Sequence, residues 1–380
     1  MKKKLLTLSL LVISSTSLGK ANDSWITQAL GLHRLPQALQ KKKGPVIVAI
    51  IDTGADISYQ DLKSRLWTNP GENGFDVSGH SKATNGIDDD GNGKIDDVHG
   101  WNFISDTPRF EDTHGHGTHV LGIIDQVLST SHTQPSEVQF MILKYYDTKL
   151  DPARTLQLTV EAVEYAVRNG AHIINYSGGG LSPNPAERQA IKRAEAAGVL
   201  LVAAAGNDGM STDIRGYYPA SYPFSNILAV GGITSNLRRV PSSNFGLHSV
   251  SLSAPGDKIE SLLPNGKKGE MTGTSQATAY ATGIAAILLS QRKDLQKPKD
   301  LIHHLLTTAQ TKKSLEEESL SGGIINLTRA SAMRTHRELA DDLPATNYNP
   351  ATEELMFNLG QGYLDTEAQT QDKPLTLRGR

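Results

Sequence analysis

Four short segments of this 380-residue chain carry side chains suited to hydrolytic chemistry. Asp52 ends the apolar run Val46–Ile51, so its carboxylate stands at the end of a predicted strand. His116 is the middle histidine of a His-Gly-His-Gly-Thr-His segment, and an imidazole that titrates near neutral pH suits a general base. Ser275 begins a predicted helix, where free backbone N–H groups favour a developing negative charge. Asn207 follows another predicted strand, where its amide could donate to an oxyanion.

Each segment alone is also compatible with a purely structural role or with a different chemistry. An Asp or Asn after a strand commonly forms a turn, and a serine at a helix start commonly caps it. Asp-Thr-Gly is also the tripeptide of aspartic proteases, which need two such carboxylates, whereas this chain has a single copy. His114, His116 and His119 could bind zinc, but the i, i+4 spacing and the glutamate of a His-Glu-x-x-His helix are missing.

Alternating apolar and amphipathic stretches predict the elements that hold these side chains. We expect helices over Thr155–Asn169 and Ala186–Ala197, between strand-like apolar runs. Those runs cover residues 46–51, 138–146, 172–176, 199–205, 227–230 and 250–253. The pattern is typical of an α/β fold with a doubly wound, mostly parallel sheet and helices on both faces. Ligands of such folds bind at the carboxyl ends of the strands.

Composition and the chain ends limit the location and the partners. The formal net charge is −2 and cysteine is absent, which argues against nucleic acid as a partner and excludes disulfides and thiol chemistry. Three lysines, an apolar run too short to span a bilayer and small residues predict a signal peptide over 1–21. We expect a catalytic domain over 22–334, a polar tail over 335–380, export to the periplasm or medium, and no membrane contact after signal removal.

Taken together, the four segments resemble the subtilisin-like serine proteases (subtilases) from about Trp25 to Ala332. The order Asp, His, Ser along the chain is that of subtilisin. The resemblance implies that Asp52 orients the histidine, that His116 is the general base and that Ser275 is the nucleophile. The same resemblance places Asn207 and the Ser275 N–H in the oxyanion hole. We therefore expect a monomeric serine endopeptidase that cleaves polypeptides through an acyl-enzyme and needs no cofactor for the chemistry.

The resemblance extends to substrate binding. Ser177, Gly178 and Gly179 match the family's substrate-binding strand, and the bond matching Tyr218–Pro219 is cis in relatives. Gly178 stands where many relatives have leucine, which predicts a wider pocket rim. Tyr217 stands where some relatives have a small residue, so an inward ring would shorten the pocket. We expect a modest preference for Leu, Met or Ala before the scissile bond, because one methylene changes selectivity little.

Several positions depart from the family pattern. Gln276, Ala279 and Tyr280 replace a common Met, Pro and His. Only 24 residues separate Ala21 from Val46, too few for an N-terminal folding domain, and we expect residues 25–39 to pack on the catalytic domain. These departures keep open a catalytically silent subtilase fold that binds peptides.

An acidic segment predicts a structural metal. Asp88, Asp90, Asn92 and Asp96 alternate around Gly93, as ligands do in an EF-hand loop. Oxygen ligands this crowded favour Ca²⁺, although the glutamate of the twelfth position is missing. A solvated acidic turn is the alternative.

Overall fold

The computed structural model describes residues 19–32 and 44–333. The predicted tail over 335–380 and residues 1–18 of the predicted signal peptide lie outside this part, whereas residues 19–21 belong to helix α1 (Gly19–Leu30). No helix within the described residues has the length and apolar character needed to cross a bilayer.

The central element is a nine-stranded sheet in the order β10-β11-β7-β6-β5-β4-β1-β3-β2. All its pairings are parallel except that of β10 with β11. Its strands are β1 (Val46–Asp52), β2 (Gly100–Asn102), β3 (Val138–Lys144), β4 (Ile173–Tyr176), β5 (Leu200–Ala204), β6 (Ile227–Ile233), β7 (Leu252–Pro255), β10 (Gln310–Thr311) and β11 (Gly323–Ile324). The predicted doubly wound, mostly parallel α/β sheet is confirmed.

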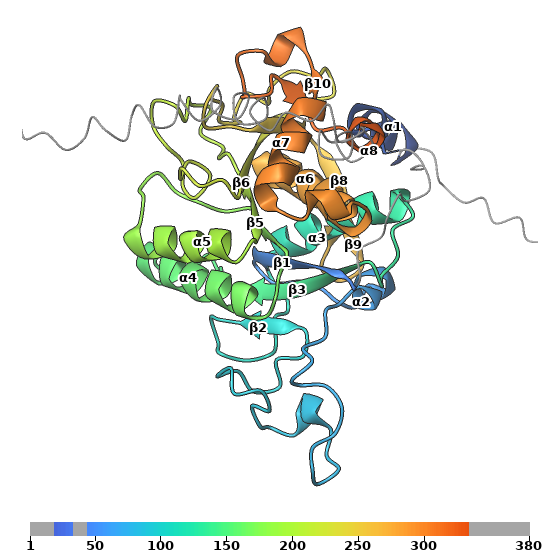
Figure 1. The fold of residues 1–380 in the computed structure, drawn as a ribbon, viewed down its shortest axis with the longest axis vertical. Coiled ribbons are helices and arrows are strands. Elements are labelled where there is room, and N and C mark those ends of the chain that lie inside the picture. The colour runs from blue at the N-terminus through green and yellow to red at the C-terminus, as the bar shows by residue number, and fades with distance from the viewer. Residues whose placement is uncertain (1–18, 33–43, 334–380) are drawn as a thin grey trace, which may run out of the picture. The chain divides into compact units, whose positions relative to one another are not determined.

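Helices cover both faces of this sheet (Figure 1). The pair α4 and α5 lies on one face, while α3 and α6 cover the other. The remaining helices are short or peripheral. The bounds are α2 (Gln60–Ser64), α3 (His116–Thr130), α4 (Pro152–Arg168), α5 (Pro185–Ala196), α6 (Thr274–Gln291), α7 (Pro298–Thr308) and α8 (Leu327–Ala332), with a separate antiparallel hairpin of β8 (Ile259–Leu263) and β9 (Lys267–Met271).

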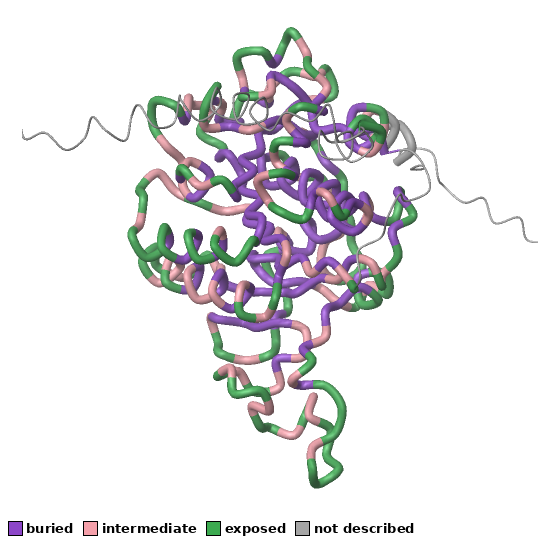
Figure 2. The backbone as a smooth tube through the Cα atoms, in the orientation of Figure 1, coloured by how far each residue is buried: buried purple, intermediate pink, exposed green. Residues whose placement is uncertain are grey.

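Strand β1 shows why both faces of the sheet are apolar. Val46, Val48 and Ile50 contact the cluster that includes α3 and α6, whereas Ala49 and Ile51 contact the cluster of α4 and α5. Side chains alternate along a strand, so a strand buried on both faces reads as one continuous apolar run. Figure 2 shows the buried chain concentrated between the helix layers.

The segment before β1 packs on the domain as far as it is described. Ile26, Leu30 and Leu32 are buried in the core of the α3 and α6 face. Asn326, at the start of α8, donates its side-chain amide to the Ala29 carbonyl at 3.3 Å. The expected packing of this segment is therefore confirmed for residues 25–32, and residues 33–39 lie outside the described part.

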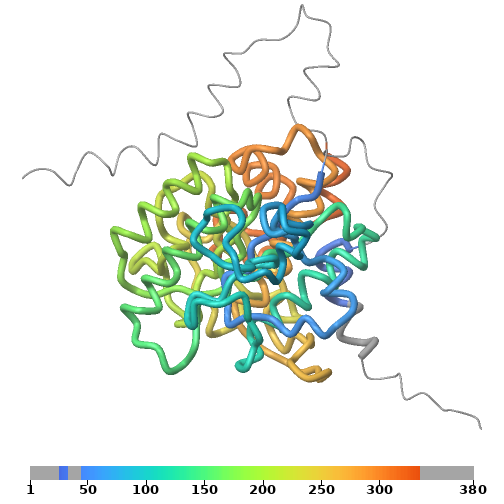
Figure 3. The backbone as a smooth tube through the Cα atoms, turned by 90° about the horizontal axis from the view of Figure 1, so that it is seen from below, coloured from blue at the N-terminus to red at the C-terminus, as the bar shows by residue number. Residues whose placement is uncertain are grey.

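A long acidic loop leaves the body between α2 and β2. It covers about residues 70–98 and forms the projection below the sheet in Figure 1, which faces the viewer in Figure 3. Phe75 and Val77, 74% and 107% exposed, lie within it.

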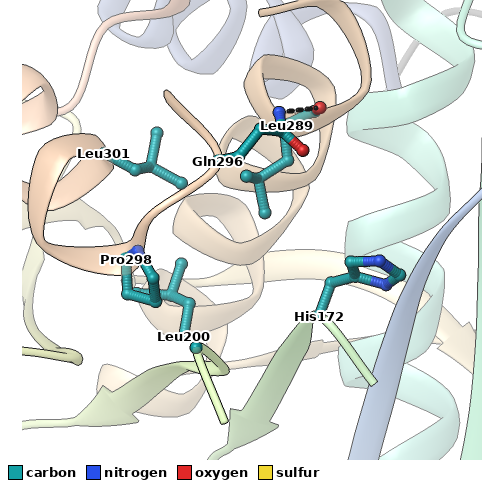
Figure 4. Close-up of a pocket in the computed structure, with 7 residues that line it drawn as sticks. His172, Leu200, Leu289, Gln296, Pro298 and Leu301 are labelled. Carbon is teal, nitrogen blue, oxygen red and sulfur yellow. Dashed lines mark hydrogen bonds between the residues drawn. The ribbon is translucent and has the colours of Figure 1, made fainter. Parts of the chain in front are cut away.

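A small cavity lies at the opposite edge of the sheet from the predicted catalytic residues. Figure 4 shows it near the amino ends of β4 and β5, where His172, Leu200, Leu289 and Pro298 line it. Its volume is about 20 Å³, which suffices for one water molecule at most. The cavity is therefore too small for a substrate, and the predicted catalytic residues lie at the carboxyl ends of the strands.

Candidate active site

Asp52 and His116 form a hydrogen-bonded pair at the carboxyl end of β1. Asp52 lies on the same face of the sheet as Ile50, because strand side chains alternate, and His116 is the first residue of α3, which covers that face. The distance between His116 Nδ1 and Asp52 Oδ1 is 2.8 Å. Burial lowers the pKa of His116, but the charge and hydrogen bond of Asp52 outweigh that effect and raise it above the ordinary value. The pair thus has the geometry of an oriented general base.

Asp112 organises the loop that carries this histidine. Its Oδ1 accepts hydrogen bonds from the Thr53 hydroxyl and from the backbone N–H groups of His114 and Gly115. Its Oδ2 accepts from the N–H and hydroxyl of Thr118, at 2.9 and 2.7 Å. The sequence patterns did not single out Asp112. An Asp followed two and three positions later by N–H groups that need acceptors is the signal that could have revealed it.

Ser275 lies in the first turn of α6 and contacts the segment after β4. Its hydroxyl donates to the Ser177 carbonyl at 3.0 Å, and Ser177 Oγ donates to the Ser275 carbonyl at 3.3 Å. No hydrogen bond joins Ser275 to His116 in the part of the chain that is described. The residue at the N-cap is Gly273, so the alternative of Ser275 as a capping serine is wrong.

Asn207 is held beside this helix start with a defined amide orientation. Its Oδ1 accepts from the Thr274 N–H at 2.9 Å and from the Thr274 hydroxyl at 3.2 Å. A backbone N–H can only donate, so the atom facing it must be the oxygen. The amide nitrogen is then left to donate elsewhere, next to the free N–H groups of the first turn of α6.

The third histidine of the segment has a structural role. His119 is fully buried, and its Nε2 lies 3.0 and 3.1 Å from the carbonyl oxygens of Ile259 and Gly269. Burial lowers its pKa, so its neutral ring donates to these carbonyls. Among the described residues, the histidines 114, 116 and 119 do not form a group that could hold a metal, which argues against the zinc alternative.

Tyr217 lies in the region that the sequence predicted to be the substrate pocket. A Cβ atom added to Gly179 would meet Tyr217 Cε1 at 2.5 Å, and one added to Gly206 would meet Tyr217 Cδ2 at 2.8 Å. These atoms are at opposite edges of the ring, so the ring spans the gap between the two segments. Burial raises the pKa of Tyr217 to about 12, and the nearby charges of Asp208 and Glu187 contribute to this rise to a smaller extent.

The expected opening of the rim at Gly178 is wrong. A Cβ atom added there would lie 2.4 Å from the hydroxyl oxygen of Tyr145. The tyrosine that follows β3 therefore occupies the space that a side chain at Gly178 would use. The peptide bond between Tyr218 and Pro219 is cis, as the resemblance implies.

The acidic loop gathers a different set of carboxylates from the expected one. Glu72, Asp88 and Asp90 each place an oxygen within 4.8 Å of the others. Asp96 lies outside this group, with its Oδ1 accepting from the Gly86 N–H. Asn92 uses both amide atoms within the protein, on Asp97 Oδ2 and on the Lys94 N–H. Of the four predicted ligands, Asp88 and Asp90 therefore belong to the carboxylate group, whereas Asn92 and Asp96 do not.

Glu72 is the residue of this group that the acidic sequence pattern did not include. It is fully buried, its Oε1 accepts from the Asp89 N–H, and its Oε2 has no hydrogen-bond partner among the described residues. Burial, with the charges of neighbouring aspartates, raises its pKa. Burial also raises the pKa of Asp97, which accepts from Asn69 and Tyr165. A cation would relieve this concentration of negative charge.

Comparisons with known proteins agree with this geometry. Residues 43–339 match the model of the subtilase family. The major intracellular serine protease of Bacillus subtilis is 31% identical over 283 residues, covering 70% of this chain and 79% of that protein. Subtilisin DY of Bacillus licheniformis is 30% identical over 297 residues, covering 78% and 94%.

A solved structure supports the same fold. The crystal structure of a cold-adapted subtilisin-like serine proteinase aligns with a TM-score of 0.58 and 23% sequence identity, covering 78% of this chain and 97% of that one. The matched family model spans most of the described domain, including every element that carries the candidate catalytic side chains. The chain belongs to the subtilase family and is a subtilisin-like serine endopeptidase.

Proposed function

We propose that Ser275, His116 and Asp52 form the catalytic triad of this endopeptidase. Ser275 Oγ attacks the scissile carbonyl while His116 accepts its proton, and Asp52 stabilises the imidazolium. His116 then gives the proton to the leaving amine, and a water molecule activated by the same ring hydrolyses the acyl-enzyme. Asn207 Nδ2 and the Ser275 N–H hold the negative oxygen in both steps.

The hydrogen bond between His116 and Asp52 is the observation that carries this proposal. A peptide-binding fold without catalysis would not need an imidazole held in this way, which argues against the silent alternative. The Ser275 hydroxyl must turn from the Ser177 carbonyl to reach the histidine.

Labelling with a fluorophosphonate tests the mechanism directly. The reagent phosphonylates an activated serine, so wild-type protein should be labelled at Ser275, located by mass spectrometry of the digested protein. Asp52→Asn should label far more slowly at the same concentration, and Ser275→Ala should not label at that site. An unlabelled wild-type protein with an intact fold would support the silent peptide-binding alternative.

We propose that the pocket beside Tyr217 prefers medium apolar side chains, such as Leu, Met or Ala, before the scissile bond. The packing of the Tyr217 ring between Gly179 and Gly206 supports a shortened pocket. Ser177, Gly178 and Gly179 would bind the substrate backbone next to it. A cleavage profile on a peptide library tests this preference.

We further propose that the acidic loop binds a structural Ca²⁺ ion. Glu72, Asp88 and Asp90 would hold it through carboxylate oxygens, the ligands that this hard cation prefers. The buried Glu72 Oε2, which has no hydrogen-bond partner among the described residues, supports a bound cation more strongly than the acidic composition alone. Calorimetric titration with Ca²⁺ after chelation tests the site, and the triad chemistry itself uses no metal.

Export and monomeric state are the remaining proposals. The lysines, apolar run and small residues at the N-terminus support cleavage near Ala21 and secretion or periplasmic location. One relative is named an intracellular protease, so location needs its own test. N-terminal sequencing of protein from each cell fraction, with light scattering on the purified domain, provides it.

A further inference from the structure

A second cavity lies beside the catalytic pair, on the side of His116 marked by His114. Its volume is about 220 Å³, and its lining includes Thr53, His114, Lys144 and Tyr146. Thr53 is the residue after Asp52, and the His114 ring lies 6.3 Å from the rings of both His116 and Tyr146. The cavity therefore lies next to the residues that would act on a bound polypeptide.

Lys144 is the buried cation of this cavity. It is 8% exposed. In the parallel register of β3 and β1 it lies opposite Asp52, so both side chains lie on the same face of the sheet. Its Nζ donates to the Glu111 carbonyl at 2.6 Å, and within the described residues no carboxylate lies within ion-pairing distance of it. An ammonium group has three donors, so two remain for a ligand. A buried charge is costly unless it is paired.

The rim of the cavity adds to this positive charge. Lys149 lines it and is exposed, while Asp147 is the single carboxylate in the lining formed by the described residues. Asp147 Oδ1 already accepts from the Lys149 backbone N–H at 2.9 Å. Two ammonium groups thus face one carboxylate. Such a site suits a carboxylate ligand and disfavours a cationic one.

The position of Tyr145 indicates which substrate residue reaches the cavity. Its hydroxyl adjoins Gly178 at the rim of the Tyr217 pocket, whereas its neighbour Tyr146 lines the cavity. Two consecutive residues of the chain therefore contact the proposed substrate-binding strand and the cavity, one each. Successive side chains of an extended peptide point to opposite sides, so neighbouring residues of one substrate can enter the two pockets.

We propose that this cavity binds an acidic side chain of the substrate, that of the residue immediately before the one beside Tyr217. A glutamate there would place its carboxylate near Lys144 Nζ, with Lys149 at the mouth. The inference rests on the proposed peptide cleavage at Ser275 and specifies its substrate class. The enzyme then selects Glu followed by a medium apolar residue, with cleavage after the latter.

Matched peptides that differ only in Glu or Gln at this position test the proposal. Wild type should cleave the Glu peptide with kcat/KM about fivefold higher, the size expected for a partly exposed ion pair, and salt should reduce that ratio. Lys144→Met and Lys149→Glu should each remove or reverse the preference. Lys192→Met, on the exposed face of α5, should keep it. Two lysine positions are used so that a fold defect at Lys144 does not decide the result.

Binding to the Ser275→Ala variant separates this inference from the proposed mechanism. Fluorescence anisotropy on that variant should show tighter binding of the Glu peptide, whether or not the wild type turns over. Equal affinity for both peptides, or a Glu preference that persists in both lysine variants, would overturn the assignment. Loss of turnover with a retained Glu preference in binding would count against the triad alone.

Discussion

Ser275 and Ser177 exchange two hydrogen bonds, from the Ser275 hydroxyl to the Ser177 carbonyl at 3.0 Å and from the Ser177 hydroxyl to the Ser275 carbonyl at 3.3 Å. This reciprocal contact ties the start of α6 to the segment after β4. The candidate nucleophile and the predicted substrate-binding strand are therefore positioned by the same two bonds. The Ser275 bond involves a backbone acceptor, so it survives replacement of the Ser177 side chain.

The first prediction is that Ser275→Ala abolishes peptide hydrolysis and leaves the fold intact. Ser275 is not the N-cap of α6, so the variant loses one hydrogen bond, worth about 1 kcal/mol. Hydrolysis of a quenched peptide and thermal melting of the same samples measure the two effects. Ser177→Ala serves as the control and should retain turnover. Residual turnover in Ser275→Ala near the wild-type level would contradict the serine mechanism.

The second prediction concerns the acid limb of the pH profile. His116 must be neutral to accept a proton, and Asp52 raises its pKa above the ordinary 6.5. Activity is thus present above the raised pKa and falls as the pH decreases through it, with a midpoint above 6.5. The profile of kcat/KM against pH reports this midpoint in the free enzyme. The surface variant His303→Gln should leave the midpoint unchanged. A wild-type midpoint below 6.5 would contradict the role of His116 as a general base whose pKa Asp52 raises.

The third prediction tests whether the metal ligands include Glu72, as the observed carboxylate group indicates, or Asp96, as the alternation in the sequence predicts. Chelation should lower the melting temperature of wild type by about 5 °C, and Ca²⁺ should restore it, because a ligand of the folded state stabilises by mass action. Glu72→Gln should lose this response and, without metal, melt higher than wild type, since it removes a buried negative charge that lies among aspartates.

Asp96→Asn is the matched control for this metal prediction. Asp96 lies outside the carboxylate group, so the variant should respond to chelation as wild type does. Melting curves of wild type, Glu72→Gln and Asp96→Asn, with chelator and with Ca²⁺, show which carboxylates the cation needs. A wild-type melting temperature that chelation does not move would reject the proposed site.

The fourth prediction is that Tyr217→Gly extends cleavage toward Phe before the scissile bond. The ring spans the gap between Gly179 and Gly206, so its removal should deepen the pocket. The ratio of kcat/KM for Phe over Leu peptides should rise about tenfold, within the range for apolar pockets. The rate of fluorophosphonate labelling controls for an intact triad, and an unchanged ratio would show that the ring does not close the pocket.

The fifth prediction concerns Glu187, which is buried and accepts a hydrogen bond from the Tyr222 hydroxyl at 2.9 Å. Burial raises its pKa from 4.5 to about 7, despite this hydrogen bond. The folded state therefore holds the proton more tightly than the unfolded chain. Its stabilising contribution is complete below pH 4.5 and is lost as the pH rises to about 7. The loss corresponds to roughly 3 kcal/mol.

Denaturant unfolding at a series of pH values measures this contribution. Glu187→Gln should flatten the fall in unfolding free energy over that window. The exposed Glu317→Gln should leave the slope as it is in wild type. Equal slopes for wild type and Glu187→Gln would show that Glu187 does not hold a proton in this way.

The sequence alone determined the class of fold and the types of catalytic side chain. The apolar run of β1 and the helical periodicity of α4 are local patterns, and they indicated elements within a few residues of their observed bounds. Asp52 was assigned correctly to the end of a strand, because the apolar run stops there. The family resemblance then supplied roles that spacing alone could not distinguish from turns and caps.

The tertiary structure decided which distant groups meet. Glu72 joins Asp88 and Asp90 only because the loop closes on itself, which no spacing within the acidic segment encodes. The Tyr145 hydroxyl reaches Gly178 from the segment that follows β3, and this contact reversed the expectation of an open rim. Side-chain direction and burial depend on packing between segments far apart in the chain. Local periodicity therefore predicts elements, whereas the orientation of Tyr217 and the burial of Lys144 follow from the assembled fold.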